Sequence, residues 1–364
     1  MFRKPCLALD IGNKNTKMVC GAVEKNRIRI HEYGISNTPD NSIKDGKIIN
    51  PNAIADTIKE FIKKHKVKAG KMVINITGTG VITRDIQLPK STDEEISKML
   101  KYDVQQYFPV DLENYVLDFK VLEEVANHEG VFNRIILAAV PIQQAEEYMK
   151  IPKLLNMEMQ AIDLPANSVS KFLSGTGIIK NRPGGMLAYK EYAVLDIGFE
   201  TTGVYIFYED KLRFNRILLT GSGNIDNLII NAYDVGSGQA EERKIVTVKI
   251  FGEEEEAGET RELVQLCNVI RPAVNNLIIE INRFFDFYNS RGKGNRIQMI
   301  YLCGGGSKLN GLDVYISSYF NIPVKHVTAS DNIIYTGVKK QEEFKNDYAY
   351  LHNAIGAVVR SNQV

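Results

Sequence analysis

The sequence has few cysteines and histidines, almost no net charge and no long apolar run. The four cysteines, Cys6, Cys20, Cys267 and Cys303, lie far apart beside apolar residues, so no pair has metal-ligand spacing and we expect buried, reduced thiols. The five histidines are scattered and suggest no ligand pair. Lys and Arg number 45 against 44 Asp and Glu, and this balance argues against a nucleic-acid partner.

No segment reads as a signal peptide or a membrane span. Asp10 interrupts the first apolar run, and stretches such as Ile135–Ile142 are far shorter than the ~20 residues that cross a bilayer. We therefore expect a cytoplasmic protein that reaches the inner face of the cell membrane only through a partner. The length of 364 residues allows two ordinary domains with a large core.

One repeated segment divides the chain. Leu9-Asp10-Ile11-Gly12 recurs as Leu195-Asp196-Ile197-Gly198, and Thr16 has its counterpart in Thr202 at the same offset. Each copy has the pattern of a strand, a polar turn, a strand, a short turn and a strand. A single repeat of half a chain predicts two related halves that face each other.

A strand that ends in Asp-Ile-Gly before a polar turn is suited to gripping phosphate. Gly12 lets the backbone approach an oxygen closely, and the amides that follow it can point at phosphate. Asp10 and Asp196 are placed to hold water molecules on Mg²⁺. Lys17 either reaches a phosphate or projects into solvent. One copy alone is a common turn, whereas two facing copies can clamp a triphosphate.

A third motif, Cys303-Gly304-Gly305-Gly306-Ser307, follows a predicted strand over Gln298–Leu302. Its glycines allow a base or ribose to lie flat on the backbone, although a tight strand–helix turn explains them equally well.

The segment Ile82–Gln160 has a pattern of its own. It predicts a strand, a helix opened by a capping box of Ser91 and Glu94, two further strands and a helix after Pro141. Such a unit is typical of an inserted subdomain.

Three further elements are predicted near the second copy. Apolar spacing predicts a helix over Arg271–Asn289 with Pro272 in its first turn, and Val246–Phe251 has a strand pattern. The four consecutive glutamates within Gly252–Gly258 are expected to form a solvated turn.

These motifs together resemble the actin, Hsp70 and sugar-kinase superfamily. The run Val81–Pro89, the acidic helix start and Tyr107-Phe108-Pro109-Val110-Asp111 are similar to the inserted subdomain of the PilM family of type IV pilus assembly proteins, relatives of the division protein FtsA. Glu280-Ile281-Asn282-Arg283 and Tyr288 are similar to that family's long helix. The resemblance spans almost the whole chain and implies an actin-like, ribonuclease H-like α/β fold with a nucleotide cleft.

The resemblance also implies a site for ATP and Mg²⁺. Its residues are those of the first phosphate loop (Asp10, Gly12, Asn13, Lys14, Asn15, Thr16, Lys17), the second phosphate loop (Asp196, Gly198, Thr201, Thr202), the turn after it (Gly221, Gly223), the segment over the base (Glu241, Lys244) and the adenosine loop (Gly304, Gly305, Gly306, Ser307). Asp10 and Asp196 would hold the metal through water, and Asn353–Ala357 would begin the second connecting helix.

The implied domain division has six parts. They are a first core (1–81), an inserted interaction subdomain (82–160), a connecting helix (161–180), a second core (186–222 and 296–340), a smaller subdomain over the nucleotide (223–295) and a C-terminal helix that returns to the first domain (341–364).

One departure from the superfamily concerns catalysis. Hydrolytic members place a Glu or Gln in the first connecting helix to orient water, but Ile162–Asn167 contains neither. Asp163 is the only candidate and lies early in the segment. Since a positioned base contributes roughly 10²–10⁴ in rate, we expect tight ATP binding with slow or absent turnover.

The resemblance implies a nucleotide-dependent scaffold of type IV pilus assembly. Its partner would be the cytoplasmic N-terminal tail of a PilN-like inner-membrane protein, docked beside the inserted subdomain, and a pilus assembly ATPase is a further implied partner. Val81–Leu88 and Ile96–Tyr107 are candidate docking segments, although core packing explains them equally well.

Two alternatives remain. An FtsA-like, filament-forming division protein would need an amphipathic C-terminal helix, which Arg360–Val364 does not supply. A small-molecule kinase would need a substrate domain with a carboxylate base, and no such signature is evident.

Overall fold

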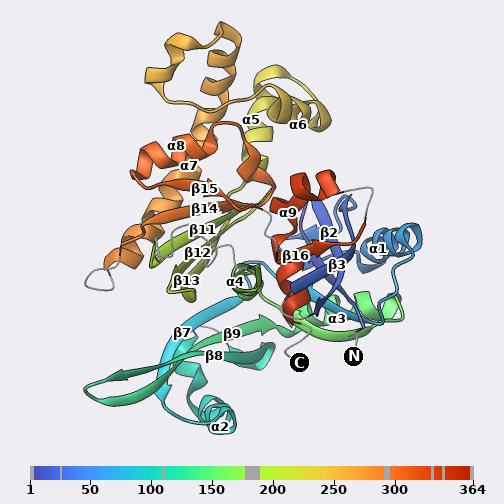
Figure 1. The fold of residues 1–364 in the computed structure, drawn as a ribbon, viewed down its shortest axis with the longest axis vertical. Coiled ribbons are helices and arrows are strands. Elements are labelled where there is room, and N and C mark those ends of the chain that lie inside the picture. Colours follow the sequence, from blue (N-terminus) through green and yellow to red (C-terminus); the bar gives the residue numbers. More distant parts are fainter. Residues whose placement is uncertain are drawn as a thin grey trace.

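The computed structural model describes residues 4–24, 27–108, 111–176, 189–290, 296–328, 332–337 and 341–360. Two α/β halves stand side by side, with a small three-stranded sheet below them and a helical lobe above the second half (Figure 1). Within these ranges, no helix is both long and apolar enough to cross a bilayer.

The first half is built on a six-stranded sheet of order β10-β6-β1-β2-β3-β16. Its strands are β1 (Cys6–Ile11), β2 (Asn15–Glu24), β3 (Arg27–Asn37), β6 (Lys71–Asn75), β10 (Glu158–Asp163) and β16 (Ile333–Tyr335), with a short hairpin of β4 (Ile43–Lys44) and β5 (Lys47–Ile48) beside it. Alternate side chains of β1 point to opposite faces. Leu7 and Leu9 pack under α1 (Pro51–His65) and α3 (Ile142–Leu154), whereas Ala8 faces α4 (Pro165–Thr176) and α9 (Gln341–Arg360).

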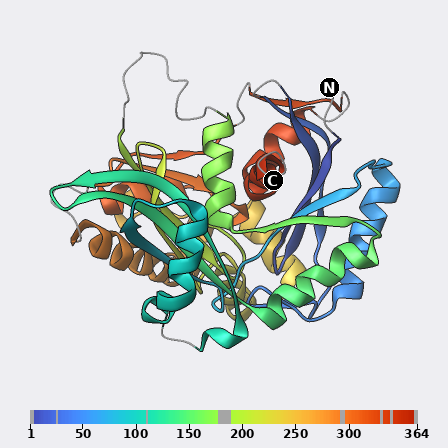
Figure 2. The same ribbon diagram turned by 90° about the horizontal axis from the view of Figure 1, so that it is seen from below.

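The second half is built on a five-stranded sheet of order β13-β12-β11-β14-β15. Its strands are β11 (Glu191–Ile197), β12 (Thr202–Tyr208), β13 (Lys211–Leu218), β14 (Met299–Cys303) and β15 (Val324–His326). One face packs on α7 (Arg261–Ser290) and α8 (Leu312–Phe320). The other face joins the core that contains α4 and α9, so these two helices lie between the sheets (Figure 2).

The repeated motif forms the same hairpin in both halves. The Gly12 amide donates to the Asn15 carbonyl at 3.0 Å in the first, and the Gly198 amide donates to the Thr201 carbonyl at 2.8 Å in the second. In each half the Asp-Ile-Gly strand pairs antiparallel with the strand after the turn. The two-half α/β arrangement expected from the repeat is therefore present.

The small sheet is the core of the inserted segment. It has the antiparallel order β7-β9-β8, from β7 (Ile82–Pro89), β9 (Gly130–Pro141) and β8 (Tyr115–Asn127). One face is covered by α2 (Asp93–Asp103), which continues into η1 (Val104–Tyr107), and η2 (Leu112–Asn114) precedes β8. The helix predicted to end this segment, α3, packs on α1 of the first half instead. The strand β10, which was not predicted, follows it and pairs with β6 of the same half.

The helix of the inserted segment begins one residue later than predicted. Thr92, rather than Ser91, is the N-cap: its hydroxyl accepts from the Glu95 amide, and the Glu95 carboxylate accepts from the Thr92 amide at 2.8 Å. The Ser91 hydroxyl donates to the Pro89 carbonyl instead. The predicted pairing of Ser91 with Glu94 was therefore wrong.

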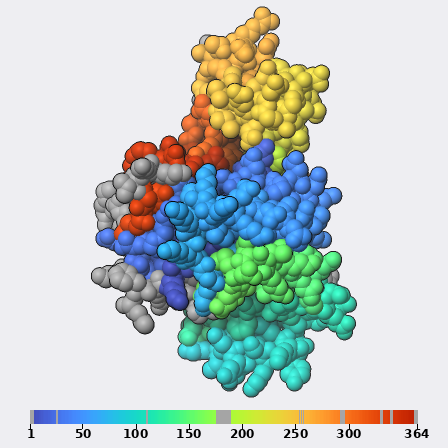
Figure 3. Space-filling view, turned by 90° about the vertical axis from the view of Figure 1, so that its right-hand side faces the viewer, coloured from blue at the N-terminus to red at the C-terminus, as the bar shows by residue number. Residues whose placement is uncertain are grey.

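The helical lobe contains α5 (Gly223–Tyr233), α6 (Ser237–Val246), η3 (Glu253–Gly258) and the first turns of α7, and it stands apart at the top of Figure 3. Two predictions for it were wrong. Helix α7 starts at Arg261, so Pro272 lies inside it rather than in its first turn. Val246–Phe251 forms no strand, and within the described residues only a single bridge joins Lys249 to Asn310.

The chain returns to the first half earlier than residue 341, because β16 pairs with β3. The adenosine-loop motif forms η4 (Gly305–Lys308) directly after β14. Several predicted segments extend beyond the described residues: Pro109 and Val110, residues 177–180 of the connecting helix, and residues 361–364 of the C-terminal part.

Candidate functional site

An open cleft lies between the two halves. Its walls are the turns of the two repeated hairpins, the glycine loop after β14, one face of α6 and part of α9. The parallel pairing of β11 with β14 places the glycine loop beside the second hairpin.

Most of the predicted nucleotide residues line this cleft. They are Asp10, Gly12, Asn13, Lys14, Asn15, Lys17, Asp196, Gly198, Thr201, Glu241, Lys244, Gly304, Gly305 and Gly306. Sequence separation among them reaches almost the length of the chain, so the fold alone brings them together. Their meeting in one cleft is the arrangement that the repeat predicted.

The other predicted residues lie behind the cleft wall. Thr16, Thr202 and Ser307 are fully buried. The Thr202 hydroxyl donates to the Thr220 carbonyl at 2.8 Å, and the Ser307 hydroxyl donates to the Gly304 carbonyl at 2.7 Å. These side chains fix the shape of the loops rather than contact a ligand.

Gly221 and Gly223 have a packing role beside Phe199. A side chain at Gly221 would come within 2.5 Å of the Phe199 carbonyl oxygen, and one at Gly223 within 3.0 Å. The two glycines therefore let the second phosphate loop lie directly on the start of α5. This contact keeps Phe199 at the cleft wall.

Three lysines of the cleft pair with carboxylates. Lys17 lies 3.1 Å from Asp10, and Lys244 lies 2.6 Å from Asp226, which lies behind the wall. The Lys14 ammonium lies 3.0 Å from Glu241, so this pair joins the first half to the lobe across the cleft. Each pair positions a cation that a phosphate group would meet.

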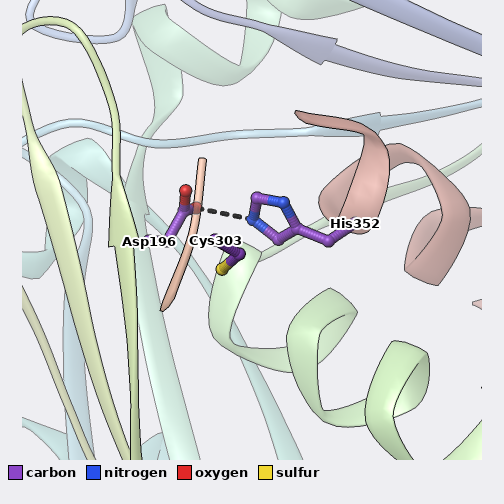
Figure 4. A group of neighbouring side chains, drawn as sticks. All are labelled: Asp196, Cys303 and His352. Carbon is purple, nitrogen blue, oxygen red and sulfur yellow. Dashed lines mark ion pairs between the residues drawn. The ribbon is translucent and has the colours of Figure 1, made fainter. Parts of the chain in front are cut away.

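Asp196 forms a buried pair with a side chain of α9. His352 Nε2 lies 2.9 Å from Asp196 Oδ2 (Figure 4). The Asn353 side-chain amide donates to the same oxygen at 2.9 Å. His352 Nδ1 lies 2.9 Å from the Ala349 carbonyl. Nδ1 is therefore within hydrogen-bond distance of a carbonyl, whereas Nε2 meets the Asp196 carboxylate at ion-pair distance without hydrogen-bond geometry. A carboxylate this close to the ring favours the doubly protonated, charged form.

The charges of this pair follow from its surroundings. Burial alone would lower the pKa of His352, but the facing Asp196 carboxylate raises that pKa well above its usual value. Burial alone would raise the pKa of Asp196, but His352 and then Asn353 bring that pKa below its usual value. Asp196 and His352 are thus both charged at neutral pH.

Cys303 completes this cluster at the end of β14. The ligand atoms of Asp196, Cys303 and His352 lie within 4.8 Å of one another (Figure 4). Burial raises the pKa of the Cys303 thiol, which keeps its proton at neutral pH. The cluster is therefore an ion pair beside a protonated thiol. A metal ion would need a lone pair on the imidazole nitrogen that faces Asp196, and in the charged ring that nitrogen carries a proton instead.

Asp163 does not line the cleft. Its carboxylate is buried, ion-paired with Lys171 at 2.7 Å and bonded to the Asn167 amide at 2.6 Å. Helix α4 contributes only Pro165 to the residues described around the cleft. No carboxylate of the first connecting helix faces the cleft among the described residues.

Sequence reasoning missed Tyr350 and His352, which also line the cleft. The only sequence signal for Tyr350 and His352 is that they lie within three residues of Asn353 on the same helix. Asn353–Ala357 was expected to be the second connecting helix, and this segment lies within α9, a helix of 20 residues. The histidine had no visible partner because Asp196 is distant in sequence.

Comparison with known proteins identifies the family. The family model described as type IV pilus assembly protein PilM matches residues 8–362. A solved structure described as a PilM-PilN type IV pilus biogenesis complex superposes with a TM-score of 0.81 at 22% identity, over 98% of each chain.

More distant structures share the fold. The ethanolamine utilization protein EutJ of Carboxydothermus hydrogenoformans matches with a TM-score of 0.56 at 12% identity, over 99% of this chain and 90% of that one. MreB5 of Spiroplasma citri bound to AMPPNP matches with a TM-score of 0.54 at 13% identity, over 100% and 97%. The expected actin-like fold is confirmed, and the chain belongs to the type IV pilus assembly protein PilM family.

Proposed function

We propose that this chain is a nucleotide-dependent scaffold of type IV pilus assembly, which binds ATP and Mg²⁺ in the cleft and docks the cytoplasmic N-terminal tail of a PilN-like inner-membrane protein. It would lie at the inner face of the membrane through that partner. The observation that supports the nucleotide most is the meeting of two identical Asp-Ile-Gly hairpins around three lysines.

The residues present fit a hydrated magnesium ion. Asp10 and Asp196 each commit Oδ2 to a protein donor, which leaves one oxygen on each for water bound to the metal. Asn353 Oδ1 is buried and has no hydrogen-bond partner among the described residues, so it suits a further water. Magnesium favours this set of few carboxylates, water and phosphate oxygens, and when bound it would neutralise phosphate charge.

Slow or absent hydrolysis is part of the proposal. A water-orienting carboxylate would have to come from the start of α4, where Pro165 is the residue at the cleft. Asp163 is held by Lys171 behind this wall. The cleft therefore has the charges that hold a nucleotide, and its carboxylates Glu200 and Glu241 come from the second hairpin and the lobe rather than from the first connecting helix.

A groove of about 1120 Å³ lies between the inserted sheet and the first half. One face of the inserted sheet is covered by α2, whereas the other presents Ile136, Ala138 and Val140 of β9 to this groove. Its opposite wall is β10 and α4. These β9 side chains are only partly buried, so the sheet has one incompletely covered apolar face.

We assign this groove to the PilN-like tail. A related structure of 22% identity is described as a PilM-PilN complex. The family resemblance places such a tail in a groove beside the inserted subdomain. An extended peptide gains affinity from backbone hydrogen bonds and from apolar pockets for alternate side chains. Val116, Leu122 and Val140 offer apolar contacts, with Asp118 and Lys120 for polar ones.

A polar relay of five residues, Asp163, Ser168, Asn75, Asn353 and Asp196, joins the groove to the cleft. The Ser168 hydroxyl lies 3.4 Å from Asp163 and donates to Asn75 at 2.7 Å. The Asn75 amide donates to the Asn353 carbonyl at 3.0 Å, and the Asn353 amide reaches Asp196 at 2.9 Å.

The two ends of the relay belong to the two sites. Asp163 lines the groove and Asp196 lines the cleft. A change at Asp196 on nucleotide binding would therefore shift polar groups under the peptide. This connection supports a docking affinity that depends on nucleotide, with a coupling of about 1–3 kcal/mol, or 5–150-fold.

The docking half of the proposal is tested with a synthetic peptide that copies the N-terminal segment of the PilN-like protein from the same genome. Ala138→Arg fills the groove and should weaken binding at least about tenfold, measured by calorimetry. Val131→Arg is the matched control, because Val131 is 46% exposed on the same strand, outside the groove. Equal binding by both variants would refute the assignment of the groove.

The coupling is tested with Ser168→Ala, which removes the link between Asp163 and Asn75 in the relay. This variant should bind the peptide but lose most of the difference between affinities measured with and without Mg-ATP. The matched control is Ser174→Ala. Ser174 lies on the same helix as Ser168, and among the described residues its hydroxyl bonds only to the Lys171 carbonyl. A full nucleotide effect in Ser168→Ala would exclude the relay as the connection.

The predicted domain division remains a proposal with two adjusted boundaries. The inserted unit would end near Pro141, since α3 and β10 pack on the first half. The second core would end before Ile333, where β16 joins the first sheet.

A further inference from the structure

A second open space lies between the inserted sheet and the second half, and it belongs to neither the nucleotide cleft nor the groove. It has a volume of about 1730 Å³ and lies between β7 and β13. We name it the arginine cleft, after Arg84, Arg134, Arg213 and Arg216, which line it.

Two strand edges form the walls of the arginine cleft. Within the described residues, β7 pairs only with β9, and β13 pairs only with β12. Five consecutive residues, Leu212 to Arg216, line the space, and so do Thr83, Arg84 and Asp85. Because neighbouring side chains of a strand point to opposite faces, consecutive lining residues mean that the space opens along the strand edges.

The two edges do not pair with each other. A hydrogen bond joins the side chains of Thr83 and Asn215 at 2.8 Å. The Arg134 guanidinium spans the gap and donates to the carbonyls of Leu212 and Arg213 at 3.1 and 3.2 Å. Apart from these contacts, neither edge has a ladder partner among the described residues, and a strand edge of this kind is a template for another extended chain.

The lining carries more positive than negative charge. Four arginines line the space against one aspartate, Asp85. Arg134 pairs with Asp85, and it shares the buried Glu123 with Arg213 and Lys211. The direct hydrogen bonds of Arg84 go to the carbonyls of Tyr107 and Thr83. Guanidinium groups in this arrangement favour carboxylates, which they bind in bidentate fashion.

Aromatic side chains form the remaining wall. Arg213 stacks over Tyr208 at 5.4 Å, and Arg216 stacks over Phe214 at 5.1 Å. Phe287 of α7 also lines the space and is 43% exposed. Aromatic residues beside arginine are enriched at the centres of protein interfaces.

We propose that the arginine cleft binds an extended acidic segment of a protein partner other than the one in the groove. The segment would pair its backbone with the edge of β7 or β13, place carboxylates on Arg84 and Arg216, and place an apolar side chain on Phe287. A peptide is favoured over a nucleic acid because two strand edges face the space and the chain as a whole has a net charge of only +1.

The arginine cleft shares a wall with the groove. Leu122 and Ile136 of the inserted sheet line both spaces. The two occupants would therefore lie next to each other on the same face of the inserted sheet, the face that α2 leaves uncovered. The proposal nevertheless stands apart from the proposed function, because its residues are outside the nucleotide cleft and its test does not use the PilN-like tail.

The test uses the full chain and a fluorescein-labelled peptide of nine residues, in which glutamate alternates with valine around a central phenylalanine. Fluorescence anisotropy should show binding that weakens several-fold when NaCl rises from about 50 to about 300 mM, because screening shortens the range of the arginine charges. A peptide with lysine in place of glutamate should not bind.

Three variants locate the site. Arg84→Glu with Arg216→Glu should weaken binding at least tenfold, and the milder Arg216→Gln should weaken it several-fold if the charge-reversed protein is unstable. Arg261→Glu is the matched control, since Arg261 is exposed at the far end of α7. Mg-ATP binding and tail binding should be unchanged in all three, which separates a failure here from a failure of the proposed function.

Three results would overturn the proposal. One is no binding of the acidic peptide, and another is equal binding by the Arg84→Glu/Arg216→Glu protein. The third is binding of a single-stranded oligothymidylate that is as tight as binding of the peptide and is lost in the same variants. That result would make the space a general polyanion site. Slower amide exchange in both β7 and β13 upon peptide binding would support the pairing of strand edges.

Discussion

Replacement of His352 by alanine should destabilise the protein, because it leaves the partly exposed Asp196 carboxylate at the cleft wall without its buried counter-charge. His352 is 2% exposed and comes from α9, whereas Asp196 lies on β11, so the pair fastens the first half to the second. The Asn353 amide would remain as a donor to the same oxygen. Breaking a buried pair in this way costs about 3–5 kcal/mol.

A double-variant cycle separates the charge from the packing. His352→Ala also removes a ring that packs against Phe172, with centroids 6.2 Å apart, so part of the loss is a cavity. Asp196→Asn removes the buried charge with little change of shape. The double variant should be more stable than the sum of the two single losses predicts, by about 1–3 kcal/mol.

Urea unfolding, followed by circular dichroism, measures all four proteins of the cycle. Additive losses, or a His352→Ala loss below about 1 kcal/mol, would refute the charged pair, since surface substitutions commonly fall within ~0.5 kcal/mol. Strictly additive behaviour would mean that His352 is a neutral packing residue.

Three further predictions concern other parts of the molecule. Burial alone would raise the pKa of Glu123, but Lys211, Arg213 and Arg134 lower that pKa below its usual value of 4.5. The Glu123 carboxylate therefore stabilises the folded state above about pH 4.5, and this stabilisation is lost as the pH falls through the lowered pKa of the folded protein. Glu123→Gln should therefore reduce stability at pH 7 and leave a smaller difference from the natural protein at pH 3, and an equal difference at both would contradict this. Phosphate release at saturating Mg-ATP should stay below about 1 s⁻¹, and a faster rate would show that the cleft has a base. Thr92→Ala should cost about 1 kcal/mol and Ser91→Ala less than about 0.5 kcal/mol, since only Thr92 is the N-cap; equal losses in urea unfolding would contradict it.

The sequence predicted the features that repeat or that depend on local pattern. The Asp-Ile-Gly hairpins were recognisable because the same residues recur in the same order, and a hairpin is determined by its own turn. Their meeting in one cleft followed from the assumption that related halves face each other. The inserted sheet was recognisable from the alternation of Leu117, Phe119 and Val121.

Local patterns failed where two readings had equal support. Ser91 and Thr92 each precede a glutamate by three residues, so the capping box had two possible registers. Pro272 suits the first turn of a helix, but the apolar spacing of Leu266 and Ile270 already continues upstream of it. Packing across the helix outweighs the hydrogen bond that proline removes.

The strand predicted over Val246–Phe251 is missing because the buried residues of this segment have no strand edge beside them to pair with in the described part of the chain. Val248 and Ile250 are buried as their alternation suggests, and so is Phe251, but they pack in the core of the second half without a strand ladder. Val246, by contrast, ends α6 and is exposed, so apolar alternation predicted burial for only part of the segment and predicted its secondary structure wrongly.

Side chains that meet across the fold had no sequence signal. His352 and Asp196 lie on different halves, and their pairing depends on where α9 crosses the end of β11. The arginines of the arginine cleft come from β7, β9 and β13, so no run of basic residues in the sequence indicates that they lie together. Such clusters follow from topology, which a single sequence specifies only through its patterns.

The most direct test of the whole account is the affinity of the PilN-like peptide for this chain, measured by calorimetry with Mg-ATP and without nucleotide. The account predicts saturable binding of one peptide per chain, with affinities that differ at least fivefold between the two conditions and equally weak binding by Ala138→Arg in both. Identical affinity with and without Mg-ATP in the natural protein, or no peptide binding at all, would contradict it.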